Sequence, residues 1–526
     1  MSLLAAASFA TPQVNYVAIL PELILIGGAL VLLVSGQLVF KKVPVVFYSV
    51  GTGIVSAAAL VAALVLWNDV QARGPFTTIA DSVAVDGFAI VFLVLVSCIL
   101  IISTAVANDF LVREHMEGPE YHVLALLAGS GAMLMAAAND LILIFVVLEI
   151  MSIPLYILAG MDLRRRESGE AAMKYFVLGA FSSAIFVYGI ALVYGATGST
   201  NLPQIAAYLS ANIVTSNGIL LAGFALVLVG FGFKVSAVPF HMWTPDVYQG
   251  APTPVTGFMT AIAKAGGFAA LLRVFFSTFG TLRTDWQPLL WALAILTLVL
   301  GAVLGLVQRD VKRMLAYSSI NHAGFILVGL AAATSSGISG SVYYVFVYAL
   351  LVLGSFAVIT VIGGTGDRNH DLDAYRGLGR RQPALALAFA ILLLGQTGVP
   401  FTTGFLAKLY VISAAVKAHS YALAVIAMLS AAVAAAFYLR LVFLMYGLRL
   451  PFGTESERGS LSLSVSGDVP GAPEPSGSEP GEVSLGPVKV PAATAVALFV
   501  TVAVTVVFGI WPAPLVDFVK AAGLLF

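Results

Sequence analysis

Charged residues are scarce in this chain: they make up 10% of its 526 residues, whereas hydrophobic residues make up 60%. A typical soluble domain carries about a quarter charged residues and cannot bury so much apolar surface. The mean hydropathy of +1.00 therefore excludes the soluble classes and predicts an α-helical protein that crosses a lipid bilayer many times. The 26 basic and 26 acidic residues cancel, so no nucleic-acid partner and no basic membrane anchor are indicated.

Cysteine is almost absent. Cys98 alone cannot build a disulfide framework, a cysteine zinc site or an iron–sulfur cluster held by this chain. The sequence also lacks a glycine-rich dinucleotide motif and a flavin motif. We therefore expect no cofactor and no metal in this chain. No basic segment precedes residues 3–10, so we expect the first span, and not a cleaved signal peptide, to direct insertion.

Hydropathy predicts about fourteen spans of roughly 20 residues each. Basic residues gather in alternate loops, which the positive-inside rule makes cytoplasmic; both termini then lie outside and the span number is even. The cytoplasmic set comprises Lys41, Lys42, Arg113, Arg164, Arg165, Arg166, Arg309, Lys312, Arg313, Arg368, Arg376, Arg380, Arg381, Arg449 and Arg458, and the other side has little beyond Arg73, Arg283, Lys417 and Lys520. The spans are expected near residues 17–40, 43–67, 84–107, 121–138, 140–161, 170–195, 217–248, 254–278, 288–307, 313–333, 341–363, 383–416, 421–446 and 491–511. The tryptophans lie near expected span ends, as is typical of interfacial anchors: Trp67, Trp243, Trp286, Trp291 and Trp511.

Two segments, 217–246 and 383–416, are too long for a straight crossing. As helices they would measure roughly 45 to 50 Å, against a hydrocarbon core about 30 Å thick. Each contains the tripeptide Val-Pro-Phe, centred on Pro239 or Pro400, with a lysine close by. Because proline removes a backbone donor, we expect one broken helix at 234–246 and another at 396–408. Corresponding broken helices predict inverted repeats with the site at the repeat interface.

The expected fold is therefore an all-α polytopic membrane protein with two inverted five-helix repeats, each containing one broken helix. We predict five regions along the chain. Residues 451–489 are rich in Ser, Gly, Pro and Glu, which is typical of a disordered loop; it would be cytoplasmic. The other regions are an N-terminal three-helix addition at 1–120, the repeats at 121–278 and 288–446, and a C-terminal span and tail at 491–526.

Ionisable residues occur where hydrocarbon is expected. Glu149, Lys234, Lys264, His322 and Lys408 each fall roughly 13 to 18 Å inside a span, near the middle of the bilayer. A lysine at the centre of a span costs about 2.5 to 3.5 kcal/mol to insert, so it normally faces protein or water. A layer of such groups suits proton movement parallel to the membrane, with water-filled half-channels to each surface. Burial can bring the pKa of a lysine and that of a carboxyl toward neutrality, so both types can exchange protons.

Glu149 and Lys234 form a possible switch within this layer. If they approach each other, each stabilises the charge of the other, and their separation would release a proton from the lysine. Lys174 is shallower, one turn after Glu170.

Structural interpretations remain open for several of these residues. A mid-span glutamate or lysine can be structural, and His322 can simply bond between helices. Glu22 can be an interfacial carboxylate at the start of the first helix. Asp246 can be solvated or can hold the loop of the broken helix. The loop residues Asp109, Asp310 and Asp367 can be solvated.

The run FKVSAVPFHMWTPDVYQGAPTPV at 233–255 resembles the antiporter-like, proton-translocating subunits of respiratory complex I, bacterial NADH-quinone oxidoreductase, and among them the subunit N family. The resemblance runs from the first span onward and leaves out only 451–489. Further matching motifs are Leu148-Glu149, EAAMKY at 170–175, AKAGG at 263–267, KRMLAYSSINH at 312–322 and GFLAK at 404–408. Type M subunits carry Glu where Lys408 stands and type L subunits add a long lateral helix, so the resemblance favours type N.

The resemblance implies a role for each matching residue. Glu149 and Lys234 would be the interacting pair, Lys264 the central relay and Lys408 the outlet, with His322 and Lys174 as intermediate relays. It also implies a bacterial plasma membrane location, with antiporter-like subunit M and small membrane subunits as partners. NAD, FMN, iron–sulfur clusters and quinone would belong to partner subunits, whose quinone reduction drives this pump.

Two other functions remain possible at this stage. A subunit of a multi-subunit sodium/proton antiporter is similar in the repeat region, and the subunits that co-purify would distinguish it. A monomeric solute transporter would need a substrate-shaped polar pocket, whereas the midplane groups here are nearly all ionisable.

Overall fold

The computed structural model describes residues 14–38, 43–212, 218–447, 489–521 and 523, which are mostly helical. A short hairpin pairs β1 (Phe76–Thr78) with β2 (Val83–Val85), antiparallel, with Phe76 opposite Val85. The helices are α1 (Leu20–Leu38), α2 (Val45–Arg73), α3 (Gly87–Arg113), α4 (Glu120–Ala137), α5 (Leu141–Ala159), α6 (Arg166–Thr197), α7 (Leu202–Ala211), α8 (Gly218–Val235), α9 (Trp243–Gly250), α10 (Thr253–Arg273), α11 (Arg283–Leu306), α12 (Val311–Ala331), α13 (Ser335–Gly363), α14 (Leu378–Arg381), α15 (Pro383–Thr397), α16 (Thr403–Lys417), α17 (Tyr421–Tyr446), α18 (Ala492–Ile510) and α19 (Ala513–Lys520). A π-helical turn (Val274–Thr278) and two 3-10 turns (Gly280–Leu282 and Leu372–Tyr375) complete the helical elements of this part of the chain.

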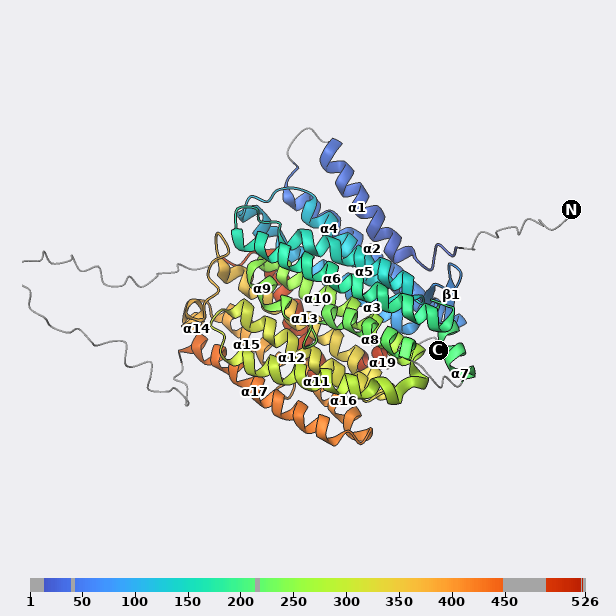
Figure 1. Ribbon diagram of the computed structural model, residues 1–526. Helices are drawn as coiled ribbons and strands as arrows, with labels where there is room; N and C mark the ends of the chain where they lie inside the picture. The colour runs from blue at the N-terminus through green and yellow to red at the C-terminus, as the bar shows by residue number, and fades with distance from the viewer. Residues whose placement is uncertain (1–13, 39–42, 213–217, 448–488, 522, 524–526) are drawn as a thin grey trace, which may run out of the picture.

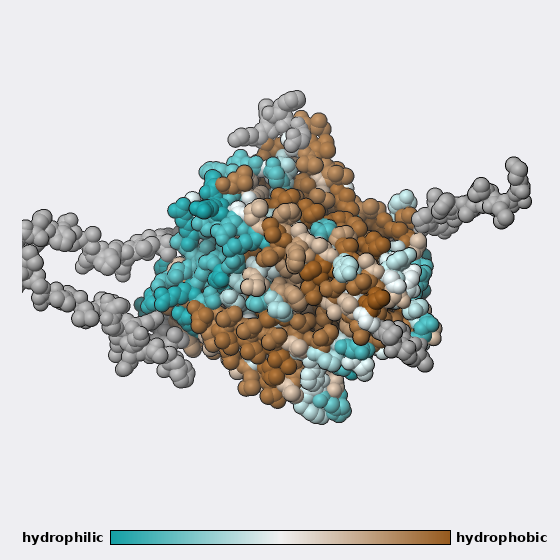
Figure 2. All heavy atoms as spheres, in the orientation of Figure 1, coloured by the Kyte–Doolittle hydropathy of each residue, from teal (hydrophilic) through white to brown (hydrophobic). Residues whose placement is uncertain are grey.

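Across the described ranges, 12 helices are long and apolar enough to cross a membrane, and the segments Leu20–Gly36 and Pro383–Thr397 are shorter apolar helices. Together they correspond to the fourteen spans predicted from hydropathy. The long helices lie side by side (Figure 1), and an apolar band separates two more hydrophilic ends (Figure 2). The prediction of an all-α polytopic membrane protein is confirmed.

Four helices form the interior of the bundle. The most apolar stretch of the α10 span and of α13 is 100% buried, and the corresponding values are 94% for α12 and 83% for α3. The same stretch is only 33% buried in α2 and in α6, which therefore face the surroundings of the chain. Residues on α10, α12 and α13 are thus shielded by other helices.

The first long segment is broken between α8 and α9. Helix α8 ends at Val235. In a continuing helix the Val235 carbonyl would accept from the N–H of residue 239, but Pro239 has no N–H to donate. The indole of Trp243, the first residue of α9, donates to the Phe233 carbonyl over 3.0 Å and holds α9 against the end of α8. The break therefore covers residues 236–242, inside the predicted interval 234–246.

The second long segment is broken between α15 and α16, at residues 398–402. Gly398 has a φ of 87°, and a Cβ at this position would lie 2.9 Å from Cδ of Lys408. Both the left-handed backbone and the close approach call for glycine. Thr402 then caps α16 by accepting from the backbone N–H of Phe405 over 3.4 Å. This break lies inside the predicted interval 396–408.

The helices around the two breaks form two sets that make similar contacts. In the first set α4 contacts α5 and α10, and α5 contacts α6; in the second set α11 contacts α12 and α17, and α12 contacts α13. Helix α1 lies on α2 and α4, α3 on α10, and α18 on α13 and α16. The inversion of one set relative to the other, and the region boundaries, remain predictions. The loop predicted at 451–489 lies, except for residue 489, outside the described residues.

Both ends of the described chain lie at one end of the bundle. The backbone N–H of Asn15 donates to Thr78 in β1 over 3.0 Å, and that of Phe88, at the start of α3, donates to the Gly523 carbonyl over 3.3 Å. In Figure 1 this end carries β1, α7 and α19, and the opposite end carries α14. This placement agrees with an even number of spans.

Three expectations from the sequence need correction. Trp243 and Trp286 are only 3% and 1% exposed, because their indole groups donate to backbone carbonyls inside the protein, so they are not interfacial anchors. Glu22 does lie in the first turn of α1, but it is 2% exposed and packed inside the bundle. Asp367 is not solvated: its side chain is completely buried among cations.

Candidate functional site

Lys234 lies near the end of α8 and is 2% exposed. Its ammonium donates to the Ser152 hydroxyl on α5 over 2.7 Å. It also lies 5.7 Å from the ring centre of Tyr175 and 6.0 Å from that of Tyr156, which is within the range of cation–π attraction. The Trp243 ring stacks on that of Tyr175, with 4.4 Å between the ring centres. The charge therefore rests on one neutral oxygen and aromatic faces.

Glu149 is on α5, one turn before Ser152, and accepts a hydrogen bond from Ser183 on α6. Among the described residues no ion pair joins Glu149 to Lys234 within 4.0 Å. Lys234 and Ser183, the hydroxyl partner of Glu149, line a cavity of about 10 Å³, which is close to the space that one water needs. The two predicted partners thus bind different serine hydroxyls, Ser183 and Ser152, and form no direct ion pair with each other.

Lys264 lies in the middle of α10 and is 2% exposed. Its ammonium donates to the carbonyl of Val235, the last residue of α8. This is the carbonyl that Pro239 leaves without a helical donor, and the negative end of the α8 dipole lies there. The sequence therefore creates an acceptor at the break, and Lys264 occupies it.

Lys408 makes the same kind of contact at the second break. It is on α16, is 6% exposed, and donates to the carbonyl of Thr397 over 2.7 Å. Thr397 is the last residue of α15, so this lysine also binds the carboxyl end of a half-helix. Its ammonium lies 5.0 Å from the ring centre of Phe325 on α12, one turn from His322.

His322 is on α12 and is 3% exposed. Its Nδ1 lies 2.8 Å from the hydroxyl of Tyr344, and its Nε2 lies 3.0 Å from that of Tyr438. Tyr438 is also bonded to Ser318, which lies 3.3 Å from Gln396, the residue before the carbonyl that Lys408 binds. His322 thus bonds between helices and also begins a polar path toward Lys408.

Hydroxyl groups occupy the space between α9 and α12. The Tyr248 hydroxyl lies 3.3 Å from that of Ser319, which is one turn before His322 along α12. Tyr348 on α13 lies beside His322, with the two rings tilted and 4.6 Å between their centres. Its hydroxyl has no hydrogen-bond partner in the described part of the chain. Hydroxyls that can bind or pass protons therefore lie between α9, which follows the first break, and the part of α12 that carries His322.

A second polar region lies at the α14 end of the bundle. Asp246 in α9 accepts from Lys174 on α6 over 2.9 Å and from Arg313 on α12 over 2.7 Å. Glu170 pairs with the same lysine over 2.7 Å. Partial burial alone would raise the pKa of Asp246, but the hydrogen bonds from Lys174 and Arg313 outweigh this and lower it. Asp246 therefore does hold the broken helix, which was the alternative to a solvated residue.

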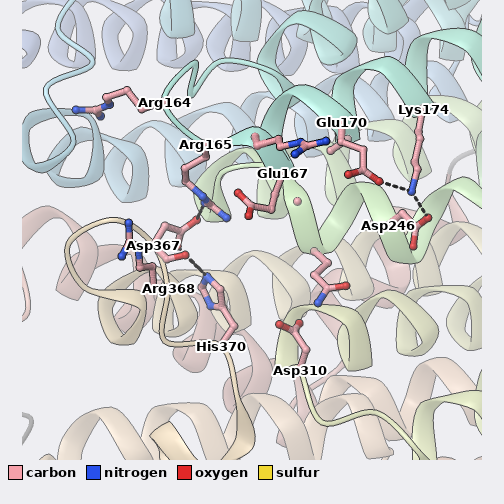
Figure 3. Close-up of a pocket in the computed structure, with 14 residues that line it drawn as sticks. Arg164, Arg165, Glu167, Glu170, Lys174, Asp246, Asp310, Asp367, Arg368 and His370 are labelled. Carbon is pink, nitrogen blue, oxygen red and sulfur yellow. Dashed lines mark hydrogen bonds and ion pairs between the residues drawn. The ribbon is translucent and has the colours of Figure 1, made fainter. Parts of the chain in front are cut away.

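Asp367 is the most enclosed member of this region. It contacts Arg165 over 2.9 Å and His370 over 3.1 Å (Figure 3). It also lies 3.6 Å from Lys312 and accepts from the Thr253 hydroxyl over 2.6 Å. Burial alone would raise the pKa of this carboxyl, but the nearby Lys312 and His370 hold it well below its usual range. Asp246 and Asp367 also line an open pocket of about 720 Å³, together with Lys174, Arg165 and His370 among their partners.

The sequence identified the buried ionisable groups but not the groups that bind them. One serine hydroxyl and two backbone carbonyls hold the lysines, and two tyrosine hydroxyls bind His322. Hydroxyls are too common in membrane helices to stand out in a sequence. Pro239 was the one available signal, since a proline four residues after Val235 predicts a free carbonyl there. No feature of the sequence predicts that Arg165 and Thr253 contact Asp367.

Comparison with known proteins places these features in a family. Residues 138–434 match the transmembrane family described as NADH:quinone oxidoreductase/Mrp antiporter. A curated relative named NADH-quinone oxidoreductase subunit N, from Acidothermus cellulolyticus, is 41% identical to this chain, and the match covers 99% of each protein.

Two solved structures share the fold. A chain of respiratory complex I from Thermus thermophilus is 31% identical, with a TM-score of 0.76, and the match covers 96% of this chain and 100% of that one. A chain of the Mrp complex from Dietzia sp. gives a TM-score of 0.80 at 20% identity, with 96% of each chain covered. At 20% identity the likeness shows the fold alone, so the sequence comparisons decide between the two kinds of complex.

Proposed function

This chain belongs to the NADH-quinone oxidoreductase subunit N family and is a proton-translocating membrane subunit, and from that premise we propose how its residues move protons. The observation that carries the proposal is the pair of buried lysines, Lys264 and Lys408, each bound to the terminal carbonyl of a broken helix. Neither pairs with a carboxylate among the described residues. A carbonyl can hold an ammonium but does not require it to stay charged, as a carboxylate would.

The proposed sequence of transfers begins at Glu149 and Lys234. While they interact, each stabilises the charge of the other. Ser183 binds Glu149 and also lines the small cavity at Lys234, so a water in that cavity would link the two. When they separate, Lys234 is left among aromatic faces, where a bare charge is costly, and it releases its proton. A movement of α8 relative to α5 is sufficient to change this pair.

Lys264 would receive protons as the central relay. From there the path continues over the Tyr248 and Ser319 hydroxyls to His322, then through Tyr438 and Ser318 toward Lys408, the outlet. The hydroxyl of Tyr348 is suited to bind a water along the way. Lys174 would act as a relay at the mouth of the large pocket, where its side chain is 42% exposed between two carboxylates.

We further propose that this chain is the pump of a proton-translocating NADH:quinone oxidoreductase and carries no redox centre. NAD, FMN, iron–sulfur clusters and quinone would be bound by partner subunits, and antiporter-like subunit M and small membrane subunits would be its neighbours. The location would be a bacterial plasma membrane, with the α14 end cytoplasmic and both termini outside, because the basic loops gather at the α14 end.

The alternative, a subunit of a sodium/proton antiporter complex, fits less well, since the curated relative is a complex I subunit at 41% identity. Purification in mild detergent followed by reconstitution in sealed vesicles separates the two. We expect flavin and iron–sulfur subunits to co-purify and NADH oxidation to acidify the vesicle interior without sodium. Co-purification with antiporter subunits alone, or transport that requires sodium, would overturn the proposal.

A further inference from the structure

A second sizeable pocket lies at the opposite end of the bundle from the large charged pocket. It has a volume of about 470 Å³, which is in the range of ligand sites, and lies between the start of α13, the end of α16 and α19. In Figure 1, α19 lies at the end of the bundle that carries β1 and α7. None of the midplane residues discussed above lines it.

The charged residues that line this pocket are both lysines. Lys417 and Lys520 line it, and neither forms an ion pair with a described residue. No carboxylate is among its lining residues. Asp517 on α19 is exposed and interacts electrostatically with Tyr410, which lines the pocket, but two lysines stand against this one carboxylate. The site therefore favours an anion.

Hydroxyl donors complete the lining. Ser335 and Ser336 belong to the first turn of α13, where backbone N–H groups also point outward and the helix dipole favours negative charge. The Tyr343 hydroxyl is a separate indication: this side chain is 1% exposed, lines the pocket, and has no hydrogen-bond partner in the described part of the chain. A buried hydroxyl without a protein partner is expected to bind a ligand or water.

The position of the pocket indicates where such an anion would come from. Helix α18 ends at Ile510, and Trp511, 64% exposed, follows at the level where tryptophans meet the lipid headgroups. Helix α19 follows directly, with Leu515, Val516 and Val519 packed inward and Lys520 exposed. Val516 and Val519 also line the pocket, so acyl-chain carbon and a headgroup can both be accommodated.

We propose that this pocket binds the phosphate of an anionic phospholipid headgroup, held by Lys417, Lys520 and the Tyr343 hydroxyl. Free inorganic phosphate has the same chemistry but would gain nothing from the apolar wall on α19. The bound lipid would join α13, α16 and α19 at the membrane surface.

The test uses the assembled complex in phosphatidylcholine vesicles that contain a photoactivatable phosphatidylglycerol probe, with crosslinked peptides mapped by mass spectrometry. We expect labelling around Ser335–Tyr343, the end of α16 and α19. The double variant Lys417→Gln/Lys520→Gln should reduce this labelling about ten- to thirtyfold, because each cation near the membrane contributes to anionic lipid binding. Tyr343→Phe should reduce it about three- to tenfold.

Arg73→Gln is the control. Arg73 is an exposed cation, paired with Asp69, at the end of α2 just before β1, and it does not line the pocket. This substitution should leave the labelling unchanged. Equal labelling by a phosphatidylcholine probe, or no loss in the double variant, would overturn the anion site. Loss of labelling on addition of millimolar inorganic phosphate alone would overturn the lipid assignment in favour of a free phosphate site.

Discussion

Cations in the middle of the bundle and cations at its α14 end are held in different ways. Lys234, Lys264 and Lys408 each donate to one neutral oxygen. Arg165, Lys312 and Arg313 each face a carboxylate within 4.0 Å. A buried cation beside a carboxylate is costly to discharge, because the partner charge would be left unpaired. A cation on a carbonyl or hydroxyl can lose its proton with less penalty, so the first region suits transport and the second suits attachment.

The largest effect on stability is expected at the paired end. Asp367→Asn leaves Arg165 and Lys312 without their buried counter-charge, which should cost about 3 to 5 kcal/mol. The measurement is the thermal midpoint and the amount of assembled complex. If the yield and the thermal midpoint of this variant were unchanged, Asp367 would not be the stabilising counter-charge of Arg165 and Lys312.

The stability that Asp367 contributes should depend on pH. The pKa of Asp367 is lowered in the folded protein, so its stabilisation is complete above the unfolded pKa of about 3.9 and is lost as the pH falls toward the folded value. Asp367→Asn should therefore lower stability at pH 7, and its stability should change less on acidification than that of the original chain. A parallel loss in both proteins would show that other groups govern acid sensitivity.

The next largest effect, now on transport, is expected at the linked pair. Glu149→Gln and Lys234→Ala should each reduce proton translocation at least about tenfold, which corresponds to more than about 1.4 kcal/mol. The double variant should be no worse than the more severe single one, because the first change already breaks the pair. Rates are compared in vesicles with matched amounts of assembled complex. Strictly additive losses in log rate would mean that the two residues act independently.

A smaller effect is expected at the outlet. Lys408→Ala removes one hydrogen bond to the Thr397 carbonyl, so the complex should assemble while proton translocation slows. The loss of that bond should cost about 1 to 3 kcal/mol, which an assembled complex can absorb. The assay is the proton-to-electron ratio and turnover in sealed vesicles. An unchanged proton-to-electron ratio and an unchanged turnover would show that Lys408 is structural and does not carry protons.

The sequence predicted more of the fold than of the site. Apolar length identified the spans, and excess length with Pro239 and Pro400 identified both breaks, because these are properties of single segments. Contacts between segments were out of reach: Asp367 looked like a solvated loop residue, yet its partners come from three distant parts of the chain. The expected depth in the bilayer identified Lys264 as a buried cation. That its acceptor is the Val235 carbonyl depends on how α10 packs against α8, and no local sequence pattern predicts such packing.

Replacing Lys264 by arginine tests the central claim most directly, because arginine keeps the charge and the donors but does not release its proton. Lys264→Met, which is permanently neutral, is measured beside it. Arg313→Lys at the α14 end is the matched control, because Arg313 contacts Asp246 through one nitrogen and a lysine can replace that contact. In vesicles with equal amounts of assembled complex, the account predicts that NADH-driven proton translocation falls at least about tenfold in Lys264→Arg and in Lys264→Met, and by less than about threefold in Arg313→Lys. Proton translocation at the original rate in Lys264→Arg would show that Lys264 is a fixed cation and would contradict the account.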